Sequence, residues 1–239
     1  LQLEVNKTSY NNLLDIEAAV ELISDFEDTT VAIIKHNNAC GCASAQTLLG
    51  AWDKALEADP VSAFGGIIVA NRAVDKETAA QMNKIFFEVV IAPAYDEDAL
   101  AILKEKKNRI ILESQNIAPT AVKFRSLLGG VLVQDRDSYV EKPEDLKPVT
   151  ELQPATELVE DLIFANKLVK HSKSNAIVLA KGKQLYASGI GQTSRVDALK
   201  QAIAKAKSFN FDLNGAVMAS DAFFPFPDCV EIAAAEGIK

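Results

Sequence analysis

The chain has 239 residues and a formal net charge of −8, and its Lys and Arg residues are scattered rather than grouped in stripes. This balance excludes sequence-independent binding to nucleic acids or anionic lipid surfaces, which requires clustered positive charge. No apolar run approaches the ~20 residues needed to cross a bilayer, so a membrane protein is excluded as well. Hydrophobic residues make up 49% of the chain, which is typical of a globular protein with a substantial core.

The first half of the chain alternates strand-like runs with helical patterns. The run TVAIIK is continuous and β-branched, as expected for a strand covered on both faces. Apolar residues at helical spacing predict the helices, and Asn11 and Asn12 are candidate caps for the first of them. The predicted strands are 30–35, 66–70, 89–92 and 109–112, and the predicted helices are 13–23, 45–56, 79–86 and 96–103.

The second half repeats this order after a long connection. Residues from Asp135 to Pro154 are charged, include three prolines and have weak periodicity. Beyond them the pattern predicts a helix at 158–169, a hairpin of strands 176–180 and 184–188, a helix capped by Ser194, and a strand at 216–218. The chain stops just after a helix-like segment, where a further strand is expected, so we expect it to be a piece of a longer protein.

The alternation of strands and helices predicts an α/β fold, in which helices flank mixed sheets. Both halves follow the same order. We therefore expect two similar subdomains, residues 1–126 and 127–239, with their boundary somewhere between about 113 and 150.

The segment from Ala219 to Asp228 (ASDAFFPFPD) is the most unusual stretch of the sequence. Pro225 and Pro227 exclude a helix interior or a central strand, so the segment is a stiff loop after a strand. Its Phe rings could hold a flat heteroaromatic ligand, and its carboxylates could accept hydrogen bonds from that ligand. The alternative is a loop whose rings fill the protein's own core.

Lys35 and His36 end a predicted strand and are followed by NNACG. Ligands bind at the carboxyl ends of strands in parallel α/β sheets, and His can exchange a proton near neutral pH. The Lys ammonium could stabilise an oxyanion. The alternative is a solvated Lys beside a hydrogen-bonded His. A similar Lys-His pair occurs at 170–171, and these are the chain's two histidines.

The three cysteines, Cys40, Cys42 and Cys229, are odd in number, and two of them are too close for an easy bridge, so we expect a reducing cytoplasm. A zinc site formed by His36, Cys40 and Cys42 would resemble that of a deaminase, but the H-x-E and C-x-x-C spacings are absent. Cys40 as a nucleophile has no evident orienting partner. The sequence favours neither role.

The turn GIGQTSR stands between a predicted strand and helix, where backbone N–H groups and Arg195 could bind an anion. An ordinary capped turn explains the same residues. Ser172, Ser174, Asn175 and Asp221 carry oxygens at predicted element ends. They could position a substrate carbonyl or surround a monovalent cation, although helix capping accounts equally well for the serines.

Five motifs, KHNNACG, DPVSAFGGIIVANR, KSNAIV, GIGQTSRVDA and ASDAFFPFPD, together resemble the transformylase region of the AICAR transformylase/IMP cyclohydrolase family. The resemblance runs in order over essentially the whole chain. It implies two cytidine-deaminase-like α/β subdomains without zinc. It also implies formyl transfer from 10-formyltetrahydrofolate to the 5-amino group of AICAR in purine biosynthesis, and a homodimer with active sites between subunits.

The resemblance also implies residue roles. His36 would be the base for the attacking amine, Lys35 would stabilise the oxyanion or the leaving nitrogen, and Asn175 would hold the formyl oxygen. The other residues implied are Phe64, Glu88 and Arg195 for the ribotide or folate, Phe223, Phe226 and Asp228 for the pterin, and Val169, Ser172, Ser174 and Asp221 for a structural potassium ion.

The sequence departs from the family pattern at Ala39, where the family usually has Pro, and in a slightly shorter GIGQTSR turn. An upstream cyclohydrolase domain, an Arg-Tyr-Gly-x-Asn-Pro segment and a C-terminal tail are also expected in the family but lie outside this sequence. Two other functions are therefore retained. One is a catalytically silent folate-binding or dimerisation fragment, and the other is a metal-dependent, deaminase-like hydrolase.

Overall fold

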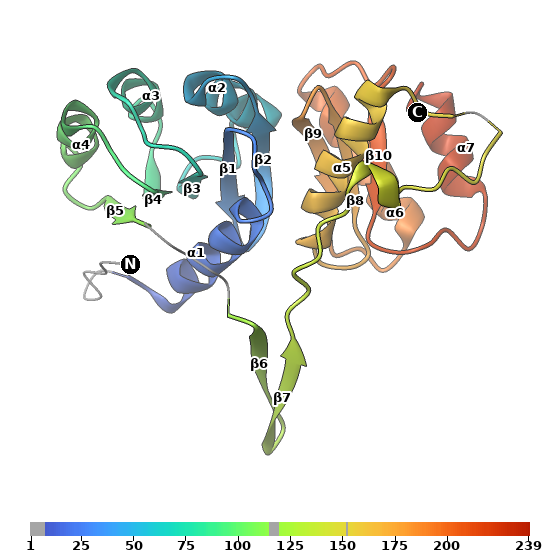
Figure 1. Cartoon of the computed structure of the whole chain (residues 1–239), viewed down its shortest axis with the longest axis horizontal. Helices are drawn as coiled ribbons and strands as arrows, with labels where there is room; N and C mark the ends of the chain where they lie inside the picture. The colour runs from blue at the N-terminus through green and yellow to red at the C-terminus, as the bar shows by residue number, and fades with distance from the viewer. Residues whose placement is uncertain (1–7, 115–119, 152) are drawn as a thin grey trace.

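The computed structural model describes residues 8–114, 120–151 and 153–239, which form an α/β fold around one mixed sheet (Figure 1). The sheet has eight strands in the order β10-β8-β9-β2-β1-β3-β4-β5. These strands are β1 (Thr30–Lys35), β2 (Asn38–Ser44), β3 (Gly66–Ala70), β4 (Phe87–Ala92), β5 (Ile110–Glu113), β8 (Ile177–Lys181), β9 (Gln184–Gly189) and β10 (Val217–Ser220).

Helices cover both faces of this sheet. Their bounds are α1 (Tyr10–Ile23), α2 (Leu48–Ala58), α3 (Lys76–Met82), α4 (Glu97–Lys104), α5 (Thr156–Lys170), α6 (Arg195–Ser208) and α7 (Asp228–Ala235). Helices α1 and α5 share one apolar core that extends along one face, across both halves of the sheet. On the other face, α2, α3 and α4 cover the first half, while α6 and α7 cover the second.

Local sequence explains where two of these helices begin. Ser9, rather than the predicted Asn11 or Asn12, is the N-cap of α1, and it exchanges hydrogen bonds with Asn12 in a capping box. Ser194 accepts from the amide of Asp197 and caps α6, as the sequence predicts. The predicted α/β class is confirmed, because β3, β4 and β5 run parallel while the remaining neighbours are antiparallel.

The two halves of the sheet meet at a narrow seam between β2 and β9. One backbone bridge, Ala43 with Gln184, joins these strands. The Gln184 side chain adds bonds to the carbonyl of Lys54 (3.0 Å) and the carboxylate of Glu57 (2.8 Å). The subdomain boundary expected from the sequence remains a prediction.

Each half contains a hairpin whose second strand abuts the following helix at a glycine. A Cβ on Gly41 of β2 would lie 2.0 Å from the carbonyl oxygen of Ala55 in α2. A Cβ on Gly189 of β9 would lie 1.9 Å from that of Ala198 in α6. Only glycine permits such close approach of a helix to a strand.

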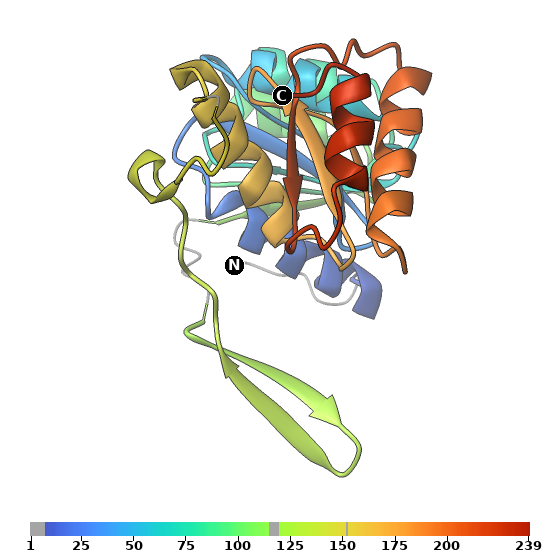
Figure 2. The same cartoon turned by 90° about the vertical axis from the view of Figure 1, so that its right-hand side faces the viewer.

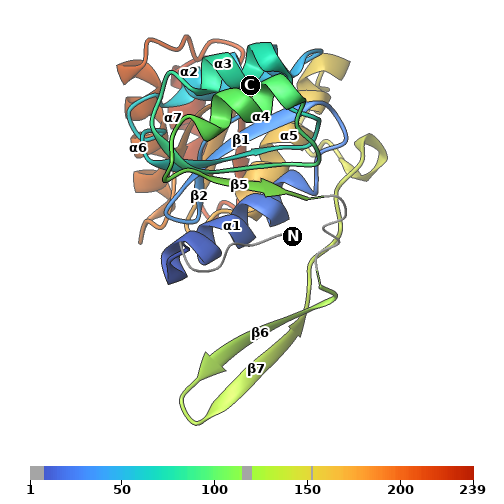
Figure 3. The same ribbon diagram turned by 90° about the vertical axis from the view of Figure 1, so that its left-hand side faces the viewer.

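A two-stranded hairpin, β6 (Val122–Leu127) and β7 (Gly130–Asp135), extends away from the sheet (Figures 2 and 3). No strand is predicted from the sequence for these residues. Between β7 and α5 the described residues contain one 3₁₀ turn, η2 (Pro143–Asp145), which agrees with the predicted long connection. Strand β2 was also missed, because NACGCAS is rich in small residues and lacks the β-branched run of a typical strand.

No helix in the described ranges is both long enough and apolar enough to span a membrane.

Candidate functional site

Lys35 and His36 lie at the turn that joins β1 to β2. Lys35 pairs with Asn38, which makes His36 and Asn37 the two central residues of a tight hairpin turn. Both have positive φ, 51° and 64°, as type I′ turns require. The expectation that His36 lies at the carboxyl end of a parallel strand is wrong, because β1 is antiparallel to both of its neighbours. A hairpin turn, rather than a parallel edge, exposes His36.

The Lys35 ammonium is held in place by two backbone carbonyls. Its Nζ donates to the oxygens of Phe64 and Gly65, both at 2.9 Å. Gly65 has a φ of 69°, and a Cβ there would come within 3.1 Å of this Nζ. The Phe64 ring is 63% exposed and lies 5.2 Å from the Phe86 ring, centroid to centroid. The structure therefore brings together Lys35 and Phe64, which the resemblance had assigned to one site.

A second group forms where β8, α6 and β10 meet. The guanidinium of Arg195 donates to the Asn175 side-chain oxygen at 2.7 Å, to Ser220 at 2.8 Å and to Asp221 at 2.5 Å. The Asn175 amide nitrogen donates in turn to the carbonyl of Gln192 at 3.0 Å. Arg195 thus orients Asn175 and Asp221 together.

Asp221 is the acidic centre of this second group. Its carboxylate accepts from the Ser174 hydroxyl, the Ala176 amide and Arg195. Burial would raise the pKa of Asp221, but these hydrogen bonds outweigh it and hold the pKa below its usual value. The charged carboxylate is therefore the form that the fold stabilises.

The predicted potassium ligands fall into two pairs. The Ser172 amide donates to the Val169 carbonyl at 3.0 Å at the end of α5, while Ser174 contacts Asp221. Oxygen donors of this kind suit K⁺, but Arg195 already balances the charge of Asp221. Among the described residues, no hydrogen bond or ion pair joins the two pairs, so the potassium site stays a prediction.

Glu88 lies on β4, and its carboxylate accepts from the Asn12 side chain at 2.6 Å. Asn12 also forms the capping box of α1 with Ser9. The contacts described therefore tie Glu88 to the start of α1, and they do not join it to Lys35 or Arg195.

The Phe loop, the segment from Ala219 to Asp228, presents two of its aromatic rings to solvent. Phe223 is 80% exposed and Phe226 is 67% exposed, so the alternative in which these rings fill the core is wrong. Phe224 alone packs against the core beneath α6 and α7. Asp228 opens α7, and its carboxylate accepts from the Cys229 amide at 2.8 Å. Two exposed aromatic rings and a carboxylate thus belong to one short segment of the chain.

Cys40 and Cys42 lie on opposite faces of the sheet. The register of β1 with β2 shifts between Ile33 and Ile34, which leaves Cys40 in a β-bulge. Cys40 packs on the α2 side and Cys42 in the core under α1 and α5. Burial raises the pKa of Cys40 to about 12 and that of Cys42 further, so neither is a thiolate near neutral pH. A shared zinc ion with His36 is incompatible with this arrangement.

No group of three or more His, Cys, Asp or Glu side chains within the described ranges is placed to hold a metal ion.

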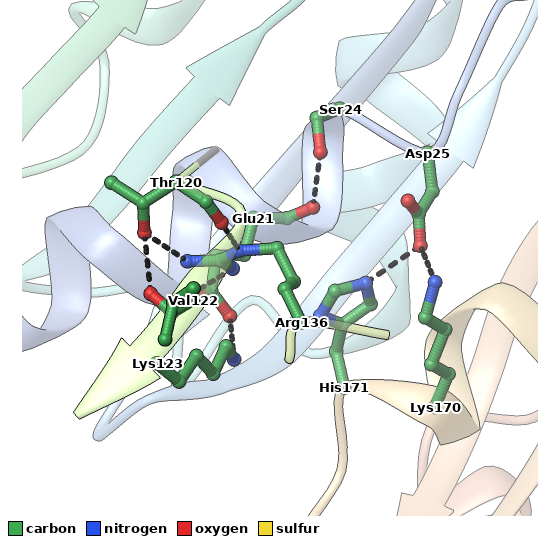
Figure 4. Close-up of polar contacts among 9 residues, drawn as sticks. All are labelled: Glu21, Ser24, Asp25, Thr120, Val122, Lys123, Arg136, Lys170 and His171. Carbon is green, nitrogen blue, oxygen red and sulfur yellow. Dashed lines mark hydrogen bonds and ion pairs between the residues drawn. The ribbon is translucent and has the colours of Figure 1, made fainter. Parts of the chain in front are cut away.

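Both histidines line one cavity of about 830 Å³. His36 contributes from the β1–β2 turn and His171 from the end of α5. The Nε2 atom of His171 lies 2.7 Å from the carboxylate of Asp25, which also pairs with Lys170 at 3.1 Å (Figure 4). Burial would raise the pKa of Asp25, but these two neighbours hold it below its usual value.

The repeated Lys-His pair is visible in the sequence, but Asp25 and His171 have no predicted role there. The repeat was the available signal, since it placed a second imidazole at an element's end. Their meeting depends on the packing of α1 and α5 on the same face of the sheet, and local sequence does not reveal it.

The described contacts therefore form two separate groups of predicted site residues. One is Lys35, His36 and Phe64, and the other is Ser174, Asn175, Arg195 and Asp221. The loop aromatics and Glu88 lie outside both groups of contacts.

Polar side chains gathered at turns and strand ends of a mixed sheet are typical of an α/β protein that binds small molecules. The sequence model of the AICARFT/IMPCHase bienzyme family matches residues 1–205, and the chain belongs to this family.

Its relatives include the bifunctional purine biosynthesis protein PurH of Bacteroides thetaiotaomicron, with 67% identity over 99% of this chain and 47% of the relative. PurH of Ruminiclostridium cellulolyticum is 50% identical over 100% of the chain and 47% of its own length. PurH of Aquifex aeolicus is 51% identical over 99% and 46%. The chain thus spans about half the length of these relatives, as expected of a piece of the bifunctional protein.

Proposed function

We propose that the chain provides the transformylase part of a purine-biosynthesis enzyme. The reaction is formyl transfer from 10-formyltetrahydrofolate to the 5-amino group of AICAR. The match of residues 1–205 to the bienzyme family carries this proposal. The exposed turn that holds Lys35 and His36 supports it from the structure. The cytoplasm, where the cysteines stay reduced, is the proposed location.

The chemistry requires three groups around the formyl carbon: a base, a cation and a donor that holds the formyl oxygen. The AICAR amine attacks that carbon, a tetrahedral oxyanion forms, and the bond from the carbon to the folate nitrogen breaks. His36 takes the proton that the amine loses, and the protonated His36 returns a proton to the folate nitrogen as it leaves. Lys35 stabilises the oxyanion or the departing nitrogen.

The contacts of Lys35 are consistent with this role. Two carbonyls take up two of the three N–H donors of its ammonium and fix the nitrogen beside Phe64. One donor remains for a developing negative charge. Lys35 is therefore oriented before the substrate arrives, which is the arrangement that lowers a barrier most effectively.

Asn175 is the proposed holder of the formyl oxygen. Arg195 occupies its side-chain oxygen, and the Gln192 carbonyl takes one N–H of its side-chain amide. The second N–H can donate to a substrate carbonyl. By donating to the side-chain oxygen of Asn175, Arg195 leaves the amide nitrogen as the end that can donate to the substrate.

The remaining assignments concern binding. Phe64, Glu88 and Arg195 would contact the ribotide or the folate. The pterin ring would lie against Phe223 and Phe226, whose exposure supports this role, with Asp228 as a hydrogen-bond acceptor. Val169, Ser172, Ser174 and Asp221 would surround potassium as a structural ion.

The proposed assembly is a homodimer, and the β6–β7 hairpin supports it. Phe124 stands opposite Val133, and Val131 lies on the same face, so one side of the hairpin is apolar. Phe124 is 72% exposed, and an isolated two-stranded hairpin is at best marginally stable. A second copy of the chain would bury this face. Sedimentation of Phe124→Ser as a monomer and of the parent chain as a dimer would agree with this, whereas identical masses would contradict it.

A catalytically silent folate-binding or dimerisation fragment is the second candidate function. Among the described residues no hydrogen bond or ion pair joins the two groups of site residues, as would be expected if one chain alone were silent. The metal-dependent hydrolase is disfavoured, because the bulge at Cys40 separates the two cysteines.

Calorimetric titration tests the proposal. We expect the 239-residue chain to bind a stable analogue of 10-formyltetrahydrofolate, and to bind AICAR weakly if the upstream ribotide segment is required. Formyl transfer is assayed in the longer protein. Turnover of the longer protein that is lost on Lys35→Ala supports the enzyme. Folate binding by the 239-residue chain, without turnover by the longer protein, supports the silent fragment. A folded chain that binds neither ligand, and a longer protein without turnover, would refute both functions.

A further inference from the structure

The turn that follows α2 begins at a buried carboxylate and ends at the carbonyls that hold Lys35. Asp59, the residue after α2, is 2% exposed. Its side chain accepts from the Ser62 amide at 2.9 Å, and its carbonyl accepts from the Ala63 amide at 3.1 Å. The carbonyls at the other end of this segment, the 59–65 turn, accept from the Lys35 ammonium. Asp59 therefore shapes the turn that fixes Lys35.

A cation from the second half of the chain balances the charge of Asp59. The Nζ atom of Lys205, on α6, lies 2.5 Å from Oδ2 of this carboxylate. Burial would raise the pKa of Asp59, but Lys205 and Ser62 hold it below its usual value. The ion pair therefore stabilises a charged carboxylate inside the fold.

The negative charge of Asp59 is needed for the pairing with Lys205 and not for the turn itself. A neutral amide could accept from Ser62 equally well, because that hydrogen bond needs only a side-chain oxygen. Among the described residues, the Oδ2 atom receives no aligned hydrogen bond, so the charge of Lys205 compensates for its burial. The ion pair thus ties the 59–65 turn to α6.

Helix α6 contacts both groups of predicted site residues through this ion pair. Arg195 opens the helix and donates to Asn175, whereas Lys205, nearer the end of the helix, pairs with Asp59. A helix is a stiff element, so it can hold the two groups at a fixed separation although no hydrogen bond or ion pair within the described ranges joins them directly.

We propose that Asp59 is a positioning residue for Lys35, because its pairing with Lys205 fixes the turn whose carbonyls orient the ammonium. The inference rests on the proposed catalytic role of Lys35. A displacement of about 1 Å at a catalytic group can lower a rate by about 10²-fold. Since Asp59 is buried, it acts through Lys35 rather than through contact with the substrate.

Asp59→Asn in the longer protein is the primary variant, because it keeps an acceptor for Ser62 and removes the ion pair. We expect kcat to fall by about 10–100-fold with little change in KM, since Lys35 acts on a charge that develops only in the transition state. Lys205→Met should give a similar loss, whereas Lys205→Arg keeps the cation and should retain most of the turnover.

The matched control is a second ion pair of the same helix. Lys207 pairs with Glu236 at 2.6 Å, so Lys207→Met removes one cation and one ion pair from α6 without removing a contact of the 59–65 turn. This variant should turn over like the parent protein.

Two further measurements separate positioning from stability. Asp59→Asn is repeated in the Lys35→Ala background, where we expect no further loss of the residual turnover, because the turn then has no ammonium to orient. Partial unfolding would instead lower turnover by the same factor in both backgrounds. Hydrogen exchange in peptides that cover residues 59–66 should be faster in Asp59→Asn than in the parent protein.

The outcomes distinguish this inference from the proposed function. A loss of turnover confined to the background that contains Lys35 supports the positioning role of Asp59. Equal losses in the two backgrounds, or parental turnover in Asp59→Asn, overturn that role and leave the proposed function standing. Parental turnover in Lys35→Ala refutes the proposed function, and the positioning role with it.

Discussion

His36 and His171 come from different halves of the sequence and line the same cavity. Each follows a lysine at the end of an element, one at a hairpin turn and the other at the end of α5. Their environments differ, because His171 is bonded to Asp25 whereas His36 is exposed. Within the described ranges the imidazole of His36 has no hydrogen-bond partner, which is consistent with its proposed role as the base.

Replacing Lys35 or His36 with Ala in the longer protein should lower turnover by roughly 10²–10⁴-fold, the usual scale for acid–base and oxyanion groups. Stability should change little for His36, which is exposed in its turn. Steady-state formyl transfer measures the effect, with Lys104→Ala as the exposed control. Near-parental turnover in both variants would refute the proposed roles.

Asp25 should make the fold sensitive to acid. Its pKa is lower in the folded chain than in the unfolded chain, where it is ~3.9, so the folded state favours the charged carboxylate. This contribution is complete above the unfolded pKa and is lost as pH falls through the lowered folded pKa. Asp25→Asn should cost about 1–3 kcal/mol at neutral pH. Melting curves from about pH 7 to about pH 3 should converge with the parent at the acid end. A constant gap would contradict this.

Phe223→Ala should weaken binding of the folate analogue and leave the melting temperature almost unchanged, because the ring is exposed. Phe224→Ala is the matched variant one residue away. Its ring packs against the core, so it should destabilise the fold by roughly 1–3 kcal/mol. Calorimetry and thermal melts separate the two effects. Unchanged folate affinity in Phe223→Ala would remove this ring from the proposed pterin site.

Asp221→Asn removes the negative charge of the carboxylate to which Arg195 and Ser174 both donate. We expect a loss of about 1–3 kcal/mol in the free energy of unfolding, because Arg195 would keep a largely buried, unbalanced charge. Denaturant titration measures the loss. The exposed pair Lys76 and Asp98 offers the control, since Asp98→Asn should change stability by less than about 1 kcal/mol.

If potassium occupies the proposed site, exchanging it for sodium should lower the melting temperature at constant ionic strength. Ion binding to the folded state stabilises it by mass action. Melts in the two salts, repeated for Ser174→Ala, test this. Identical melting temperatures for the parent chain would count against the ion.

The sequence was sufficient to predict elements with a strong local pattern. The apolar run of β1, the cap at Ser194 and the hairpin of β8 and β9 all appear where expected. Strand β2 was not predicted. Its Gly41 permits the close approach of α2, and its cysteines were considered only as possible metal or redox residues. The β6–β7 hairpin has an alternating pattern, but it forms a separate two-stranded sheet that packs on no core, so burial does not set its two faces apart.

The candidate site could be predicted only in part, because its contacts join residues that are far apart in the sequence. Resemblance assigned Lys35, Asn175 and Arg195, and the structure adds that Arg195 holds Asn175 while Phe64 holds Lys35 through its carbonyl. The link between Asp25 and His171 depends on two helices that share one face of the sheet. No local pattern encodes such a meeting.

The narrow seam between β2 and β9 has a consequence for synthesis of the chain. The first half emerges and can fold before β9 is made, so β2 is then an open edge that could pair with another chain. One bridge, at Ala43 and Gln184, covers this edge in the finished protein. Between translation of β2 and of β9, the nascent chain therefore carries an unpaired strand edge.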